Sequence, residues 1–214
     1  MEGGEPRESP HIPGEIETGS SQWMSDCACV SSVGTLRGMS EHNILINRAP
    51  VLTLWATSVA ERLGFDRDEA LTLGKAVAGL TAQSKGRRLA IFKPVPQEIK
   101  DARARKRGEE FAIEIFGRAV PAINTAEGVR AVTKDKPIDA KSVERYLESK
   151  FGESLGNVSE AMRDLAKAFR PEELSTEAFK LYEEFRPAIP GGVSGWGSKG
   201  ELDIGRIRGL ARKK

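Results

Sequence analysis

The chain has 214 residues, of which 39% are hydrophobic and only 6% aromatic, and its charges nearly cancel to a net charge of +2. This length suits one sizeable domain with tails. The small net charge excludes a whole-molecule field strong enough to capture nucleic acid or membrane, so binding to either would need a local patch. No apolar run is long enough to span a bilayer, so the sequence predicts no transmembrane helix.

The N-terminal residues 1–38 are rich in Gly, Ser, Pro and Glu and carry no periodic apolar positions. Such a segment cannot bury enough surface to offset its chain entropy, so we predict that it is disordered. It has the pattern of neither a signal peptide nor a transit peptide, which predicts a cytoplasmic protein, or a nuclear one if the source has a nucleus. We predict a single globular domain over residues 39–214, with a basic excursion at 93–110 and a C-terminal loop at 187–200.

Cysteine and histidine are scarce. Cys27 and Cys29 are too close for an unstrained mutual disulfide, and His11 and His42 are the only histidines. All four lie in or beside the segment predicted to be disordered, so we expect no metal site and no cofactor. Catalysis by a histidine-activated nucleophile would have no base, although carboxylate acid–base chemistry stays open.

Residues 50–63 predict a first helix. Pro50 suits a first helical turn, and Gly64 ends the segment. The apolar residues recur at a spacing of three or four, which is typical of a helix with one buried face: Val51, Leu52, Trp55, Val59 and Leu63.

A second helix is predicted to begin at Asp66, with Glu69 completing a capping box. Ala70, Gly74 and Ala78 follow at intervals of four and give this helix one very small face. Glycine inside a helix costs roughly 1 kcal/mol, and close approach of another helix would offset that cost. The partner helix is predicted to belong either to the same chain or to a second copy in a homodimer.

The remaining elements are a small sheet and a group of helices. Strands are predicted at 89–92 and 110–116, and "RAVPAI" is expected to pair with the second of these. Asp139 or Ser142 is predicted to cap a helix that Gly152 ends. Three further helical segments are "VSEAMRDLAKAF", a segment opened by Pro171, and a short basic C-terminal segment capped by Asp203.

Two motifs resemble known functional patterns without their context. Residues 195–200 match G-x-G-x-x-G, but no strand precedes them and no long helix follows, so we interpret the match as accidental and Trp196 as an anchor for the loop. Residues 60–77 have the rhythm of a helix-turn-helix, yet the acidic start of the second helix would face phosphates in a major groove. A plain helical hairpin is the alternative interpretation.

The positive charge is concentrated in one segment. Residues 84–108 carry nine cations against two anions, and residues 199–214 carry six against two. Helix, helix, strand, basic excursion and strand also follow the order of a winged-helix unit with a long wing. We therefore predict contact with a DNA or RNA phosphate backbone through the basic segment. The residues predicted to make it are Lys85, Arg87, Arg88, Arg103, Arg105 and Arg107.

The chain also resembles a family of small, mainly bacterial proteins without an established activity. The resemblance covers roughly residues 44–210 and is carried by "INRAPVLTLWA", "ERLGFDRDEALTLGKAVAGL" and "SVERYLESKFGE". It implies a domain start near Met39 and supplies no catalytic or binding residues.

The sequence thus predicts a mainly helical α+β domain, with an N-terminal helical hairpin, a small antiparallel sheet and C-terminal helices. The leading function is a non-enzymatic nucleic-acid-binding protein that does not enter membranes. The alternatives are a homodimeric scaffold or assembly protein that uses the small helix face, and a small-molecule enzyme that uses carboxylates.

Overall fold

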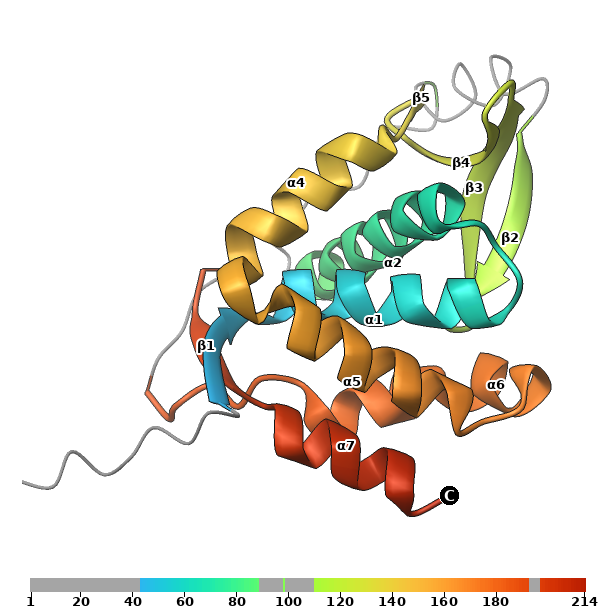
Figure 1. The fold of residues 1–214 in the computed structure, drawn as a ribbon. Coiled ribbons are helices and arrows are strands. Elements are labelled where there is room, and N and C mark those ends of the chain that lie inside the picture. Colours follow the sequence, from blue (N-terminus) through green and yellow to red (C-terminus); the bar gives the residue numbers. More distant parts are fainter. Residues whose placement is uncertain (1–42, 89–97, 99–109, 193–196) are drawn as a thin grey trace, which may run out of the picture. The chain divides into compact units, whose positions relative to one another are not determined.

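The computed structural model describes residues 43–88, 98, 110–192 and 197–214, all of them within one compact unit, Gly38–Lys214. The rest of the chain, including residues 1–38 and the predicted strand 89–92, lies outside the described residues. The helices are α1 (Arg48–Arg62), α2 (Arg67–Arg88), α4 (Ala140–Phe151), the short η1 (Gly152–Ser154), α5 (Leu155–Lys167), α6 (Pro171–Phe185) and α7 (Ile204–Arg212). The strands are β1 (Asn43–Asn47), β2 (Phe111–Ile115), β3 (Arg118–Thr125), β4 (Gly128–Thr133), β5 (Lys136–Pro137) and β6 (Lys199–Asp203). This composition confirms the predicted mainly helical α+β class (Figure 1).

Helix α1 lies at the centre of the domain, in contact with α2, α4, α5 and α6 (Figure 1). Every residue from 50 to 60 is buried, so the helix is covered all round and not only along the predicted apolar stripe. The hydroxyl groups of its buried polar residues are hydrogen-bonded within the helix. Thr53, Thr57 and Ser58 each donate to the carbonyl four residues earlier, at 2.9, 2.9 and 3.1 Å. Because these bonds close within the helix, polar residues occupy core positions at little cost.

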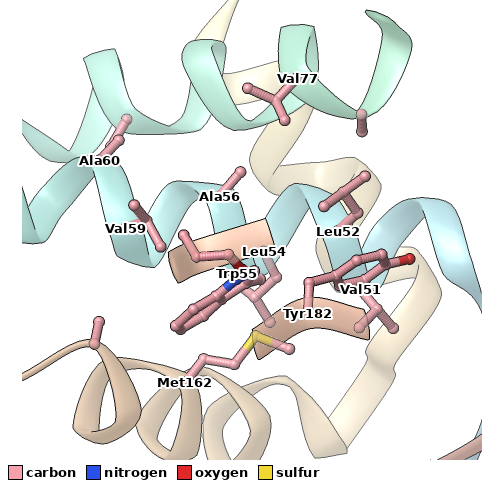
Figure 2. Close-up of a cluster of buried hydrophobic side chains, with 14 of the residues drawn as sticks. Val51, Leu52, Leu54, Trp55, Ala56, Val59, Ala60, Val77, Met162 and Tyr182 are labelled. Atoms are coloured by element: carbon pink, nitrogen blue, oxygen red, sulfur yellow. Dashed lines mark hydrogen bonds between the residues drawn. The ribbon is translucent and has the colours of Figure 1, made fainter. Parts of the chain in front are cut away.

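Trp55 is the largest fully buried side chain and joins α1 to α6 (Figure 2). Its indole N–H donates to the Ala178 carbonyl at 2.8 Å, and its ring meets that of Phe185 edge-on with centroids 5.5 Å apart. Met162 of α5 and Tyr182 of α6 belong to the same buried cluster. The apolar positions of these three helices thus converge on one core.

The small face of α2 packs against α1. Ala70, Gly74 and Ala78 are all buried. A Cβ atom at Gly74 would lie 2.6 Å from the Thr53 carbonyl oxygen, so only glycine permits this separation of the two helices. The predicted helical hairpin is therefore present, and α1 of the same chain occupies the face at Gly74.

The main sheet is an antiparallel meander in the order β2-β3-β4-β5. The predicted pairing of β2 with β3 is confirmed, with Ile113 opposite Val120. Phe116 and Gly117 form the turn between them, both with positive φ, and the Phe116 ring packs edge-on against Phe179 of α6. Strands β4 and β5 extend the sheet beyond the two strands that the sequence predicted in this region.

A second, two-stranded sheet joins the two ends of the described domain. Strands β1 and β6 are antiparallel, with Ile44 opposite Leu202. Lys199 and Gly200, which the sequence assigned to the loop 187–200, belong to β6. The predicted anchor Trp196 lies outside the described residues.

The helix caps match the local signals. Asp139 accepts from the backbone N–H groups of Lys141 and Ser142, both at 3.2 Å, and Asp203 accepts from that of Arg206 at 3.0 Å. Glu69 accepts from the Asp66 N–H at 3.1 Å, which is the reciprocal half of the predicted capping box. None of the helices in the described part of the chain is both long and apolar enough to cross a membrane.

Candidate functional site

The structure places the predicted phosphate-binding residues only in part. Lys85 is exposed near the end of α2. Arg87 and Arg88 end that helix, and their side chains lie outside what the structure describes. Arg103, Arg105 and Arg107 lie outside the described residues altogether. The joint phosphate-binding surface of these six cations therefore stays a prediction.

A different cationic site lies between α2 and α4. The Lys75 ammonium of α2 stands 3.6 Å from the centre of the Tyr146 ring, which α4 supplies. Lys150, one helical turn after Tyr146, places its ammonium 6.0 Å from the same centre. We call these three residues the two-lysine cluster. Two cations thus share one aromatic ring, where the electron-rich face attracts positive charge.

Within the described part of the chain, the positive charge of the two-lysine cluster has no ion-pair partner. Among the described residues, no carboxylate lies within ion-pair distance of Lys75 or Lys150, whereas Glu61 pairs with both Arg67 and Arg163, at 2.8 and 3.2 Å. Burial, followed by repulsion from the Lys150 ammonium, lowers the pKa of Lys75. Burial also raises the pKa of Tyr146, so the phenol stays neutral and supplies no counter-charge. An anion is the missing partner that this arrangement favours.

Space next to Lys75 is left open by a glycine. Gly79 lies one turn further along the same side of α2 and is exposed. Helical side chains lean toward the N-terminus, so a larger residue at position 79 would cover the turn that carries Lys75. A Cβ atom placed there would meet no atom of the described residues within 4 Å. A ligand can therefore approach Lys75 along the bare backbone of Gly79.

The N-terminal part of α2 is hydrogen-bonded to the main sheet. The Glu69 carboxylate accepts from the Val129 N–H of β4 at 2.7 Å, and the Thr72 hydroxyl accepts from the Ala131 N–H at 3.1 Å. The buried Arg130 guanidinium lies 3.6 Å from the Asp68 carboxylate. A DNA-recognition helix presents its N-terminal residues to the groove. These contacts therefore disfavour the helix-turn-helix interpretation.

Helix α7 carries further unpaired cations. Arg206, Arg212 and Lys213 are exposed, and none of them has a carboxylate at ion-pair distance in the part of the chain that the structure describes. Lys214 differs, because it lies 3.5 Å from Glu173 and 5.1 Å from the centre of the Phe169 ring. The C-terminal helix is thus a second positive surface.

No group of His, Cys, Asp and Glu residues within the described ranges is arranged to hold a metal ion. Comparison with known proteins gives no match: no family model, no curated protein and no solved structure is similar to the chain. The site is therefore argued from its own residues.

The sequence did not predict the two-lysine cluster. Neither Lys75 nor Tyr146 is among the residues that the sequence predicts to bind a ligand. One signal was present: Lys75 is the only charged residue between Ala70 and Leu80 on a helix that is otherwise small and apolar there. A charge in such a position needs a specific surrounding, and only the fold supplies Tyr146 and Lys150.

Proposed function

We propose that the protein is a non-enzymatic binding protein for the phosphate backbone of nucleic acid. The observation that carries this proposal is the two-lysine cluster, in which two ammonium groups share the Tyr146 ring without a carboxylate partner among the described residues. Unpaired cations held at fixed positions neutralise phosphates and release their counterions, which is the main source of affinity for nucleic acid.

Helix α2 connects this cluster to the most basic segment of the sequence. Lys85 follows Lys75 by ten residues, which corresponds to about 15 Å along a helix axis. About four phosphates of one DNA strand follow one another over such a length. The helix then continues into Arg87 and Arg88 and so into the segment with nine cations against two anions. One bound duplex could therefore contact the cluster and the basic segment together.

The proposed binding has little base specificity. No aromatic residue is interleaved with the cations between residues 93 and 110, so base stacking is not provided there. The Tyr146 ring already receives the Lys75 ammonium on one side. Contacts to phosphate fix position along a nucleic acid and carry no sequence information.

The proposal is tested by titrating labelled duplex DNA and single-stranded RNA with the full chain, at low and moderate salt, with fluorescence anisotropy as the readout. We expect binding at low salt that weakens as salt rises. Replacing Arg87, Arg88, Arg103, Arg105 and Arg107 by glutamine should lower the salt slope on duplex DNA by about 4–5, since each lost phosphate contact removes roughly 0.9. The double variant Lys75→Gln, Lys150→Gln should lower it by about 2.

A matched control removes charge elsewhere. Lys180 is paired with Glu177 at 2.8 Å on α6, so Lys180→Gln deletes one exposed cation outside the proposed surface. This variant should bind as the natural chain does. Absence of binding at low salt, or an unchanged slope in both multiple variants, would refute the proposed function.

A further inference from the structure

We propose that Lys75 is a reactive amine that condenses with a small aldehyde carrying a phosphate group, and that Lys150 holds that phosphate. This inference uses the two-lysine cluster but does not depend on nucleic-acid binding. It concerns the covalent chemistry of one nitrogen rather than the charge of a surface.

The positions of Lys75 and Lys150 suit them to different roles. Lys75 is partly buried between α2 and α4, and its ammonium lies 3.6 Å from the ring centre of Tyr146. Lys150 is exposed, and its ammonium lies 6.0 Å from the same ring centre. A ligand entering from solvent meets Lys150 first and reaches Lys75 second. An anionic group at Lys150 therefore leaves the other end of a small molecule directed toward Lys75.

The electrostatic environment favours the neutral amine that such chemistry requires. Burial and the adjacent Lys150 ammonium lower the pKa of Lys75, while the Tyr146 ring face acts in the opposite direction by stabilising the ammonium. A lysine partly removed from water next to a second cation is the arrangement that activates amines toward carbonyl groups.

The proposed step is a condensation without oxidation or reduction. The Lys75 ammonium first releases a proton to solvent, and the neutral nitrogen then attacks the aldehyde carbon. A C–N bond forms, a proton passes from nitrogen to oxygen, and loss of one water molecule gives the imine. The phosphate takes no part in the bond changes and stays at Lys150, where it supplies the negative charge that the cluster lacks.

Access is provided by Gly79. A Cβ atom at this position would meet no atom within 4 Å, so the surface beside Lys75 is open. Leucine at position 79 would cover this turn without altering the charge of the cluster. Since Gly79 is exposed and packs against no neighbour, the Gly79→Leu variant should fold.

The experiment uses pyridoxal 5′-phosphate as the probe aldehyde at limiting concentration. The full chain is incubated with it, the imine is fixed by borohydride, and the labelled lysine is mapped by peptide mass spectrometry. We expect most of the label on Lys75. Lys150→Gln should lower this labelling about tenfold, as expected for loss of one charged contact to the phosphate, and Gly79→Leu should also lower it.

Two controls separate the parts of the proposal. Pyridoxal, which lacks the phosphate, should label Lys75 less and should not respond to Lys150→Gln. Lys180→Gln should leave Lys75 labelling unchanged, because Lys180 is exposed and paired with Glu177. Equal labelling of Lys75 and Lys180, or labelling of Lys75 that ignores both Lys150→Gln and Gly79→Leu, overturns the inference.

The outcome is distinguishable from that of the proposed function. Lys75→Arg keeps the positive charge but cannot form the imine, so it should lose labelling and retain nucleic-acid binding. Circular dichroism establishes that this variant is folded. Labelling without any nucleic-acid binding would refute the proposed function alone, and the reverse result would refute only the reactive lysine.

Discussion

At the scale of single residues, Trp55 connects the central helix to the C-terminal half of the chain. It is fully buried, stacks edge-on with Phe185, and donates its indole N–H to the Ala178 carbonyl. A large aromatic side chain with its one polar atom satisfied combines apolar burial with a directional contact. Loss of this residue should therefore affect the whole core.

We expect Trp55→Ala to lower the free energy of unfolding by roughly 3–5 kcal/mol, because the cavity cannot fully collapse. Chemical denaturation followed by circular dichroism measures it. Trp55→Phe retains most of the apolar volume and should cost less, with loss of the bond to Ala178 as its main effect. Near-native stability of the alanine variant would contradict the central position of Trp55.

The two tyrosines, Tyr146 and Tyr182, give a pH-dependent prediction. Burial raises the pKa of Tyr182 to about 12 and also raises that of Tyr146. Because the folded state favours the protonated phenols, their stabilising contribution is complete below the unfolded pKa of about 10 and is lost as pH rises through the folded pKa, which for Tyr182 is about 12.

In an alkaline absorbance titration at pH 10, the native chain should therefore show less phenolate than the urea-unfolded chain, which should be half ionised there. The chain contains only these two tyrosines, so the signal is not masked by others. The Tyr146→Phe and Tyr182→Phe variants assign the two steps. A native titration that coincides with the unfolded one would show that neither phenol is buried.

At the scale of secondary-structure elements, α2 serves three different partners along its length. Its first turn bonds to β4 through Glu69, its small face packs on α1 at Gly74, and Lys75 faces Tyr146 of α4. These roles alternate from one residue to the next because successive residues of a helix point in different directions. Gly74 and Gly79 of this helix therefore lie in opposite environments: Gly74 is packed against α1, and Gly79 is exposed.

Alanine substitutions at these glycines should change stability in opposite directions. Gly74→Ala should destabilise by roughly 1–3 kcal/mol, because its Cβ would lie 2.6 Å from the Thr53 carbonyl oxygen. Gly79→Ala should stabilise by roughly 0.5–1 kcal/mol, since alanine loses less backbone entropy and meets open space. Thermal and denaturant unfolding of the pair provide the comparison, in which each variant controls for the other. A stabilised Gly74→Ala variant would refute the close packing.

At the scale of the whole molecule, the charge is divided along the sequence. The segments 84–108 and 199–214 are strongly basic, although the net charge is only +2, so the remainder of the chain is acidic. The described core draws on both ends of the domain, from Ile44 to Ala211, and includes Ile204 and Ile207 of the basic segment 199–214. The C-terminal segment therefore contributes to stability as well as to the positive charge.

A chain that begins at residue 39 should fold with an unchanged melting temperature. Residues 1–38 have a composition that cannot form a core, and the pairing of β1 with β6 already closes the described domain at Asn43. Limited proteolysis of the full chain and thermal unfolding of the truncated chain measure this. A truncated chain that does not fold would show that the segment contributes to the domain.

The sequence by itself determined the positions of most helices and their caps. Asp139, Asp203 and the Asp66–Glu69 pair act on backbone groups two or three residues away, so their signals are local and readable. The strand pair β2–β3 was also predicted, because the two strands are joined by a two-residue turn.

Only the tertiary structure decided the contacts between distant residues. The β1–β6 pairing joins opposite ends of the domain, and no local pattern specifies such a partner. The burial of α1 on all sides between Pro50 and Ala60 was hidden by its hydroxyl residues, whose hydroxyl groups donate to carbonyl groups of the same helix. The two-lysine cluster forms because α4 packs against α2 and brings Tyr146 and Lys150 next to Lys75. Attraction and repulsion between charges depend on distance in space and not on separation along the chain.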